Sequence, residues 1–460
     1  WAERKQAVVK AVKGCWQAYR RDAFGADEYL PLSRSGRFFG DKHRGVGFTI
    51  ADTLDTLLIT GLRAEYEEGR NWVARNLTFN VNATVSVFET TIRVLGGLLS
   101  AYALSGDAIL LQRARELGDR LLPAFQTPSG LPYPQINLHS GTGQYYTWRG
   151  EAVSLAEVGT LQMEFRELSR RTGDKRYWQV AKKVDVLLAR MPSLDGLLPT
   201  VFEPPKNHLA ALGYTMGAEA DSYYEYLLKQ WLQTSKTTPA LRQRYDKSIQ
   251  GMRKHLVRVS ARDRLTFVGN LEDDNTFSAR MEHLTCFIAA TLALGSMHDT
   301  ANATRAQADA NLAADITNTC VRMYTDMPSG LSPEIIRFRQ PASSAEKDVY
   351  VRPQEAYNLL RPEAVESLFL MWRMTGHVKY REQGWHIFQR MRQHASTPDG
   401  LCFTSLKDVT TVPAPQRDLL ESFVMAETFK YLFLLFEDDP NVLPLDRFVF
   451  TTEAHPLPIF

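Results

Sequence analysis

The chain has 460 residues, of which 44% are hydrophobic and 23% are charged, and this is the composition of an ordinary globular protein. It carries 54 basic and 52 acidic residues, so its formal net charge is +2. A charge balance this even argues against nucleic acid as a partner and gives no electrostatic reason to expect binding to a membrane surface.

Three segments along the chain share one pattern, in which a helix ends, a Ser/Thr-Gly-Asp/His turn follows and a second amphipathic helix begins. The turns centre on Gly106, Gly173 and Gly376. Glycine is the usual left-handed residue that closes a helix, and the Asp or His after it starts the next helix. The spacing of the turns fits a unit of about 67 residues, two helices long, that repeats roughly seven times.

The rest of the chain also reads as helical. Apolar residues before the first turn recur at helical spacing, as at Ile92, Leu95 and Leu99. Strand-like stretches are few, and one of them is Phe448–Phe450. The longest continuous apolar run, Phe429–Phe436, is too short to span a membrane. We therefore expect helix pairs, stacked or closed into a ring, and no linker divides residues 1–460 into separate domains.

Several acidic residues stand in apolar and aromatic surroundings. They are Glu89, Asp221, Glu334, Glu363, Glu366, Glu427 and Glu453. Each has an ordinary explanation when taken singly, because an acid in the first turn of a helix suits the helix dipole and an acid four residues from an arginine forms a surface pair. Taken together, these acids favour a functional role, because a ring of helices brings the ends of its helices into one cavity. Buried carboxylates there are costly unless they are paired, bind a metal or take part in catalysis.

A cavity lined by carboxylates and aromatic side chains suits the cleavage of a glycosidic bond. One acid protonates the leaving oxygen, a second activates water, and aromatic faces hold the sugar ring. A helical repeat scaffold without enzymatic activity is the alternative from another class. It would explain the period of the repeat but neither the clustered acids nor the chemistry-rich C-terminal segment FTTEAHPLPIF.

The motifs resemble those of class I α-1,2-mannosidases, glycoside hydrolase family 47, of the endoplasmic-reticulum and Golgi processing type. The stretches that carry the resemblance are FTIADTLDTLLITGL, VFETTIRVLGGLLSAY, AEADSYYEYLLKQW, GLSPE, LLRPEAVESLF, ESFVMAETFKYLFLLF and FTTEAHPLPIF. They cover nearly the whole chain in the order of the family. The resemblance implies an (α/α)7 barrel plugged by a C-terminal β-hairpin, and a calcium-dependent, inverting exo-hydrolase that trims α-1,2-linked mannose from high-mannose N-glycans.

The resemblance also implies roles for individual residues. Glu89 is the expected general acid, acting directly or through a water, and Glu363 is the expected base. Asp221 and Glu334 are further catalytic carboxylates, and the resemblance leaves open which of Glu89, Asp221 and Glu334 donates the proton. Residues that resemble the lining of the mannose subsite are Arg93, His283, Arg361, Glu366, Phe423, Glu427 and Glu453. We expect His283 and His455 to be hydrogen-bonded cavity histidines rather than metal ligands.

The C-terminal segment is expected to deliver a calcium site. By resemblance, the carbonyl and hydroxyl oxygens of Thr452 bind Ca²⁺, and waters and sugar hydroxyls complete its coordination. Oxygen ligands are what this hard cation prefers. The prolines Pro456 and Pro458 fix the path of the chain after the hairpin tip.

The four cysteines include no CxxC pair, so a thiolate zinc site is not expected. The resemblance pairs Cys286 with Cys320 in a disulfide. Cys15 and Cys402 have no counterpart in the family, and we expect them to be buried free thiols.

One residue departs from the family pattern. Glu219 stands two positions before Asp221, where the reticulum-type enzymes carry an arginine that contacts the glycan and restricts which branch is trimmed. A glutamate reverses the charge, so we expect substrate binding with looser branch selection.

The sequence also indicates a compartment. Three N-glycosylation sequons, at Asn76, Asn82 and Asn302, favour the secretory pathway. We expect a monomer in the lumen of the endoplasmic reticulum or Golgi, anchored to the membrane through an N-terminal segment that precedes Trp1. The alternative within the family is a mannosidase-like lectin of glycoprotein degradation, although such relatives typically lack the Cys286–Cys320 type of pair.

Overall fold

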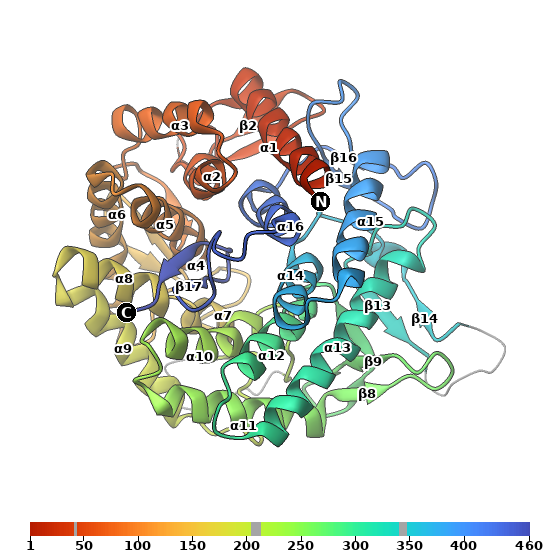
Figure 1. Cartoon of the computed structure of the whole chain (residues 1–460). Coiled ribbons are helices and arrows are strands. Elements are labelled where there is room, and N and C mark those ends of the chain that lie inside the picture. Colours follow the sequence, from red (N-terminus) through yellow and green to blue (C-terminus); the bar gives the residue numbers. More distant parts are fainter. Residues whose placement is uncertain (41–43, 204–212, 340–346) are drawn as a thin grey trace.

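The computed structural model describes residues 1–40, 44–203, 213–339 and 347–460, and in that part of the chain helices pair into a closed ring (Figure 1). The inner helices are α2 (Phe48–Ile59), α5 (Gly96–Ser105), α8 (Gln162–Thr172), α10 (Asp221–Gln233), α12 (Phe287–Met297), α14 (Glu363–Thr375) and α16 (Phe429–Phe436). Their outer partners are α3 (Arg63–Arg75), α6 (Ala108–Leu121), α9 (Lys175–Arg190), α11 (Pro239–His255), α13 (Ala303–Thr325), α15 (Val378–His394) and α1 (Ala2–Ala23). The predicted (α/α)7 barrel is confirmed.

Burial separates the two layers. All eight residues of α16 are buried, whereas the outer helix α15 buries only one stripe of its 17 residues. A helix that is apolar all round belongs in an interior, and an amphipathic helix belongs at a surface. The ring closes where α1, the first helix of the chain, packs on α16, the last (Figure 1).

The repeated turns form as predicted. Gly106, Gly173 and Gly376 each follow an inner helix in the left-handed conformation, with φ of 73°, 74° and 68°. Asp107 and Asp174 then cap the outer helices by accepting a hydrogen bond from the backbone two residues later. The repeat read from the sequence is therefore the inner-to-outer crossing of the barrel.

The inner helix α5 is preceded by an irregular segment. Thr90–Leu95 forms a π-helical segment between the short α4 (Val87–Glu89) and α5. By length and composition, the whole span Val87–Ser105 is long and apolar enough to cross a membrane, contrary to the expectation from continuous apolar runs. However, 67% of its 18-residue apolar stretch is buried inside the barrel. Its hydrophobicity is what a core helix needs.

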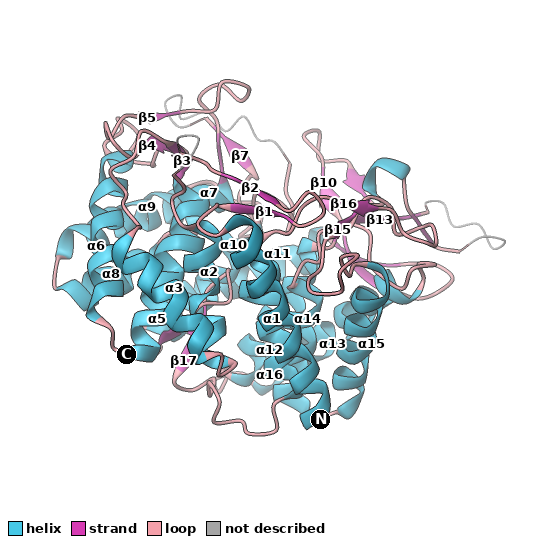
Figure 2. Ribbon diagram, turned by 90° about the horizontal axis from the view of Figure 1, so that it is seen from above, coloured by secondary structure: helices cyan, strands magenta, loops and turns pink. Residues whose placement is uncertain are grey.

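Short strands gather at one end of the barrel (Figure 2). Their sheets are all antiparallel and contain at most three strands. The strands are β1 (Glu28–Leu30), β2 (Ser35–Arg37), β3 (Thr84–Ser86), β4 (Gln135–Asn137), β5 (Gly143–Gln144), β6 (Val153–Ser154), β7 (Val201–Phe202), β8 (Val257–Val259), β9 (Thr266–Val268), β10 (Asn270–Leu271), β11 (Phe277–Ser278), β12 (Arg280–Glu282), β13 (Ile335–Phe338), β14 (Val349–Tyr350), β15 (Ser405–Leu406) and β16 (Gln416–Arg417).

The C-terminal hairpin enters the ring from the other end (Figures 1 and 2). It consists of β17 (Phe448–Phe450) and β18 (Pro456–Pro458), which pair with Phe450 opposite Pro456. Its tip, residues 451–455, is therefore held inside the barrel. The predicted strand and the predicted plug are both confirmed.

Two disulfides cross-link the chain. Cys286–Cys320 joins the residue just before α12 to α13, as the resemblance implied. The expectation of free thiols at the other two positions is wrong, because Cys15 of α1 is bonded to Cys402, which follows α15. Both of these cysteines are buried in the interface where the ring closes.

Candidate active site

Four of the acids predicted from the sequence lie at or just before the starts of inner helices. Asp221 and Glu363 are the first residues of α10 and α14. Glu89 ends α4, just before the irregular turn that leads into α5, and Glu427 lies in the π-helical segment Val424–Thr428 that leads into α16. Glu334 immediately precedes β13. The barrel thus brings together acids that are far apart in sequence.

Glu363 is held by a histidine, which is held in turn by a tyrosine. His283 lies with Nδ1 2.8 Å from Oε2 of Glu363 and Nε2 2.8 Å from the Tyr324 hydroxyl. In the neutral tautomer that carries its proton on Nδ1, His283 donates to the carboxylate and accepts from the hydroxyl, so each polar atom has its partner. His283 is 1% exposed, which confirms the hydrogen-bonded histidine expected at this position.

Glu334 and Arg361 form a second unit beside Glu363. The Nε of Arg361 donates to Oε2 of Glu334 at 2.6 Å. The buried Phe423 ring lies 5.5 Å from the guanidinium carbon of Arg361 and 5.5 Å from that of Arg93. Phe423 therefore links the Glu334 side of the site to the Arg93 side.

Asp221 has the most unusual electrostatic environment of the predicted catalytic acids. Burial raises the pKa of its carboxyl to about 8, and the negative charges of Glu225, Glu282 and Glu363 raise it further against the opposing Ser222 amide bond. At neutral pH the carboxyl is consequently protonated, and it is available as a proton donor.

Behind Asp221, a buried lysine balances two carboxylates. Lys229 makes ion pairs with Glu225 and, at 3.4 Å, with Glu366. Burial also raises the pKa of Glu366 to about 8, against the lowering effect of Lys229. Glu366 in turn accepts a hydrogen bond from the Tyr431 hydroxyl at 3.3 Å. Lys229 therefore pairs with both Glu225 and Glu366, and the raised pKa means that Glu366 is mainly protonated at neutral pH.

Arg93 is the hub on the opposite side of the site. Its Nε donates to Glu89 at 2.8 Å and its terminal nitrogen donates to Glu453, at the hairpin tip, at 2.5 Å. Burial raises the pKa of Glu453 and of Glu427 well above the usual range, and repulsion from neighbouring carboxylates adds to the effect although Arg93 opposes it. The site therefore holds more carboxyl groups than its cations can neutralise.

That surplus of acidic oxygens bears on the calcium expected at Thr452. Among the hydrogen bonds of the described residues, Thr452 makes only one, from its amide to the Tyr226 hydroxyl at 3.4 Å. Its carbonyl and hydroxyl oxygens are therefore available to a cation, next to the Glu453 carboxyl. No group of three or more His, Cys, Asp or Glu side chains with metal-holding geometry occurs in the described ranges. A site built on threonine oxygens and waters does not need one, so the residues present fit Ca²⁺.

Glu219 lies at the edge of an open pocket of about 590 Å³ on the strand side of the barrel. It adopts a left-handed conformation (φ 74°) and makes an ion pair with Arg149, whose side chain also lies 3.6 Å from Glu157. Trp148, which is 71% exposed, lines the same pocket. The reversed charge at Glu219 is thus partly neutralised by Arg149 from a neighbouring loop.

Sequence reasoning missed several members of the site. They are Asp52, Glu225, Lys229, Glu282, Tyr324, Ser422 and Lys430. Lys229 and Lys430 could have been predicted, because each lies among apolar residues in an inner helix. A lysine that is buried there requires an anionic partner. Tyr324 and Ser422 had none, because their partners come from distant parts of the chain.

Comparison with known proteins places these residues in a family. Residues 11–459 match the model of glycosyl hydrolase family 47. The chain is 45% identical over 461 residues to an endoplasmic reticulum mannosyl-oligosaccharide 1,2-alpha-mannosidase of Homo sapiens, with 99% of this chain and 64% of the relative covered. It is 40% identical over 479 residues to the mannosyl-oligosaccharide 1,2-alpha-mannosidase of Candida albicans, with 100% of this chain and 84% of the relative covered.

Solved structures agree with this placement. An alpha-1,2-mannosidase from Trichoderma reesei superposes with a TM-score of 0.90 at 28% identity, with 100% of this chain and 99% of that chain covered. A D-mannose isomerase, at 11% identity and a TM-score of 0.57, with 76% of this chain and 87% of that chain covered, shares the fold alone.

Proposed function

Because the chain belongs to glycosyl hydrolase family 47, we propose that it is a calcium-dependent exo-α-1,2-mannosidase that trims high-mannose N-glycans with inversion. The relatives named above are mannosyl-oligosaccharide 1,2-alpha-mannosidases, and the human one is an enzyme of the endoplasmic reticulum. The exposed sequon residues Asn76, Asn82 and Asn302, together with two disulfides, suit the oxidising lumen of the secretory pathway, where we place this chain. Its substrates there would be glycoproteins, and it would act as a monomer.

The observation that carries this proposal is the contrast between Asp221 and Glu363. Burial and neighbouring acids raise the pKa of Asp221 to about 8, so that its carboxyl keeps a proton. Glu363 instead receives a hydrogen-bond donor from His283 at 2.8 Å. Two acids that interact electrostatically and have environments this different are suited to acid and base roles in glycoside hydrolysis.

In the mechanism we propose, Asp221 donates its proton to the glycosidic oxygen as the bond to mannose breaks. Glu363 accepts a proton from the water that attacks the anomeric carbon from the opposite face. His283, fixed by Tyr324, keeps the Glu363 carboxylate oriented for that water. Glu334 holds Arg361 in place, which positions one wall of the mannose subsite.

The remaining residues bind the sugar. Arg93 and Arg361 flank the Phe423 ring and offer donors to sugar hydroxyls, while Glu366, Glu427 and Glu453 offer acceptors. We assign Phe423 to contact the sugar ring, and the two arginines hold its orientation. Glu89, in its ion pair with Arg93, remains the alternative proton donor, acting through a water.

Ca²⁺ would be held by the oxygens of Thr452, next to Glu453. When bound, it orients sugar hydroxyls and offsets the negative charge of the surrounding carboxylates. A mannosidase-like lectin, the alternative function, would need the sugar subsite but neither a protonated Asp221 nor a Glu363 oriented by His283.

The test is release of free mannose from a high-mannose glycan with nine mannoses, in the presence of Ca²⁺. Glu363→Gln should lower turnover by roughly 10²–10⁴-fold, the usual contribution of general-base catalysis. Glu382→Gln is a matched control, because Glu382 makes only an exposed pair with Arg4 on the outer surface. Turnover within a few-fold of wild type in Glu363→Gln would remove Glu363 from the mechanism, and glycan binding without any mannose release by the wild type would favour the lectin.

A further inference from the structure

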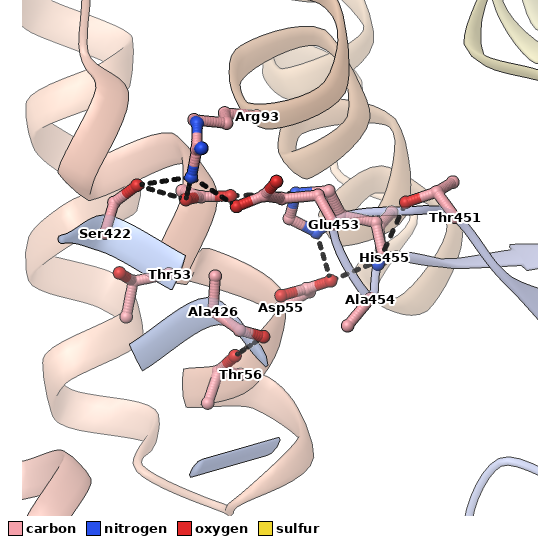
Figure 3. Close-up of polar contacts among 12 residues, drawn as sticks. Thr53, Asp55, Thr56, Arg93, Ser422, Ala426, Thr451, Glu453, Ala454 and His455 are labelled. Carbon is pink, nitrogen blue, oxygen red and sulfur yellow. Dashed lines mark hydrogen bonds and ion pairs between the residues drawn. The ribbon is translucent and has the colours of Figure 1, made fainter. Parts of the chain in front are cut away.

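Beneath the sugar subsite lies a group of buried charges that the proposed mechanism does not use. It consists of Asp52 and Asp55 on α2, Lys430 on α16 and His455 at the hairpin tip, and we call it the hairpin anchor. Figure 3 shows two of its members, Asp55 and His455. All four side chains are fully buried. Burial of four ionisable groups is costly unless each has partners, so their arrangement requires an explanation.

His455 is held between two carboxylates. Its Nδ1 lies 2.8 Å from Asp55 and its Nε2 lies 3.1 Å from Asp52. A neutral imidazole has only one N–H donor, whereas two carboxylates require two, so this geometry demands the doubly protonated ring. Burial by itself lowers the pKa of His455, but the two aspartates outweigh it and raise the pKa to about 9.

The Asp55 contact leads toward the backbone of the hairpin. Lys430 makes an ion pair with Asp55 at 2.9 Å, and its ammonium also donates to the carbonyl of Ala454 at 2.8 Å. Ser100 donates to the same carboxylate at 2.8 Å. The contacts around Asp55 therefore connect the tip of the hairpin to α16 and α5. None of these contacts reaches a residue of the sugar subsite.

The Asp52 contact leads toward the sugar subsite. Ser422 donates to Asp52 at 2.5 Å and accepts from Arg93 at 3.3 Å, and the Arg93 guanidinium lies 3.7 Å from Asp52 itself. Arg93 then holds Glu453. His455, Asp52, Ser422 and Arg93 thus form one continuous polar path, and Figure 3 shows Arg93 reaching Ser422 on one side and Glu453 on the other.

We propose that His455 is a positioning residue for the reaction, acting through Asp52 and Ser422 to fix the Arg93 guanidinium against the sugar. The inference rests on the proposed function, because Arg93 is assigned there to the mannose subsite. It assigns separate tasks to the two ring nitrogens: Nε2 supports the active site, and Nδ1 supports the fold.

Two substitutions separate these tasks. The amide nitrogen of glutamine lies near the place of Nε2, so His455→Gln retains a donor toward Asp52 and loses the one toward Asp55. The amide nitrogen of asparagine lies near the place of Nδ1, so His455→Asn does the reverse. The matched control is Asp299→Asn, which removes a buried carboxylate paired with Arg242 and Arg305 in the connection between α12 and α13.

The measurements are kcat and KM for mannose release and the melting temperature of each variant. His455→Asn should lose kcat by roughly tenfold or more with a small loss of melting temperature, whereas His455→Gln should melt lower yet keep kcat within a few-fold of wild type. Asp299→Asn should melt lower with unchanged kcat. If the two His455 variants lose kcat only in proportion to their loss of melting temperature, or if the asparagine variant is the more active, the positioning role is wrong.

If the His455 variants do not fold, Ser422→Ala provides an independent test of the same polar path. It removes the link between Asp52 and Arg93 and leaves both contacts of His455 in place. We expect kcat to fall by roughly tenfold with a nearly unchanged melting temperature, and wild-type kcat in this variant would overturn the path. Absence of mannose release by the wild type itself would instead refute the proposed function on which the inference rests.

Discussion

Asp221 and Glu363 both begin inner helices, so their local sequence contexts look alike, and only their neighbours distinguish them. Asp221 faces the charges of Glu225, Glu282 and Glu363, whereas Glu363 faces His283. Since Glu225 is four residues from Asp221, part of that environment is visible in the sequence. Glu282 and His283 come from another part of the chain, and no local pattern predicts that they meet Asp221 and Glu363.

A general acid must be protonated to act, and the folded-state pKa of Asp221 is about 8. If Asp221 is the proton donor, kcat/KM should fall as pH rises above about 8. Asp221→Asn should lower kcat/KM by roughly 10²–10⁴-fold and abolish that alkaline limb. A pH–rate profile of the wild type, Asp221→Asn and Glu89→Gln decides the matter, because an alkaline limb that persists in Asp221→Asn and vanishes in Glu89→Gln would transfer the role to Glu89.

Glu219 is expected to influence which mannose branch is trimmed. Its carboxylate pairs with Arg149 and offers only acceptors to a glycan, whereas an arginine offers a fork of donors. We expect the wild type to remove more than one α-1,2-mannose at comparable rates, and we expect Glu219→Arg to become more selective. Its new guanidinium would also repel Arg149, so Arg149→Gln in the same background should strengthen the effect.

The measurement is a time course on a glycan with nine mannoses. Loss of one buried hydrogen-bond partner is worth about 1–3 kcal/mol, which is enough to separate the rates at different branches. A wild type that stops cleanly after one mannose, or a Glu219→Arg variant that trims in the wild-type order, would show that Glu219 does not set branch selection.

Among the elements of the structure, the helix pairs were the most predictable from the sequence. The turns at Gly106, Gly173 and Gly376 revealed the repeat because each glycine must adopt a left-handed conformation that other residues avoid. The π-helical segment Thr90–Leu95 was not predictable, because its apolar spacing satisfies an ordinary helix equally well. The bond between Cys15 and Cys402 was missed for a different reason: its partners are 387 residues apart and meet only when the ring closes.

The two disulfides should differ in their contribution to stability. On the chain-entropy model the bond that closes 34 residues is worth about 4 kcal/mol, and the bond that closes 387 residues about 6 kcal/mol, both as upper limits. Paired Cys→Ser variants of each bond, compared by denaturant unfolding, should therefore both be destabilised, the Cys15/Cys402 variant more. Equal stability of the Cys15/Cys402 variant and the wild type would show that closure of the ring does not depend on the bond.

The hairpin is the other decisive element. Removal of residues 451–460 takes away Thr452, Glu453 and His455 and leaves the buried Asp55 and Lys430 in an empty barrel interior. We expect complete loss of mannose release and a lower melting temperature. Retention of activity by the shortened chain would contradict both the plug and the calcium site assigned to its tip.

The barrel concentrates acids that are individually costly to bury, and the Ca²⁺ that we propose at Thr452 would offset part of that cost. Chelation should therefore abolish activity and lower the melting temperature, because an ion that binds only the folded state stabilises it. Added Ca²⁺ should restore both, and Thr452→Val should weaken the restoration. A chelated sample that releases mannose at the full rate would contradict the role of calcium.

We propose that the barrel hydrolyses an α-1,2-mannosidic bond with inversion. The anomeric form of the released mannose is a direct test of that reaction. Proton NMR spectra recorded during the first turnovers on a high-mannose glycan distinguish β-mannose from α-mannose before the two equilibrate. If Asp221 acts as the acid and Glu363 as the base on opposite faces of the sugar, as we propose, β-mannose appears first. Initial release of α-mannose would contradict inversion, and no mannose release by a folded, calcium-supplemented protein would contradict the proposed hydrolysis.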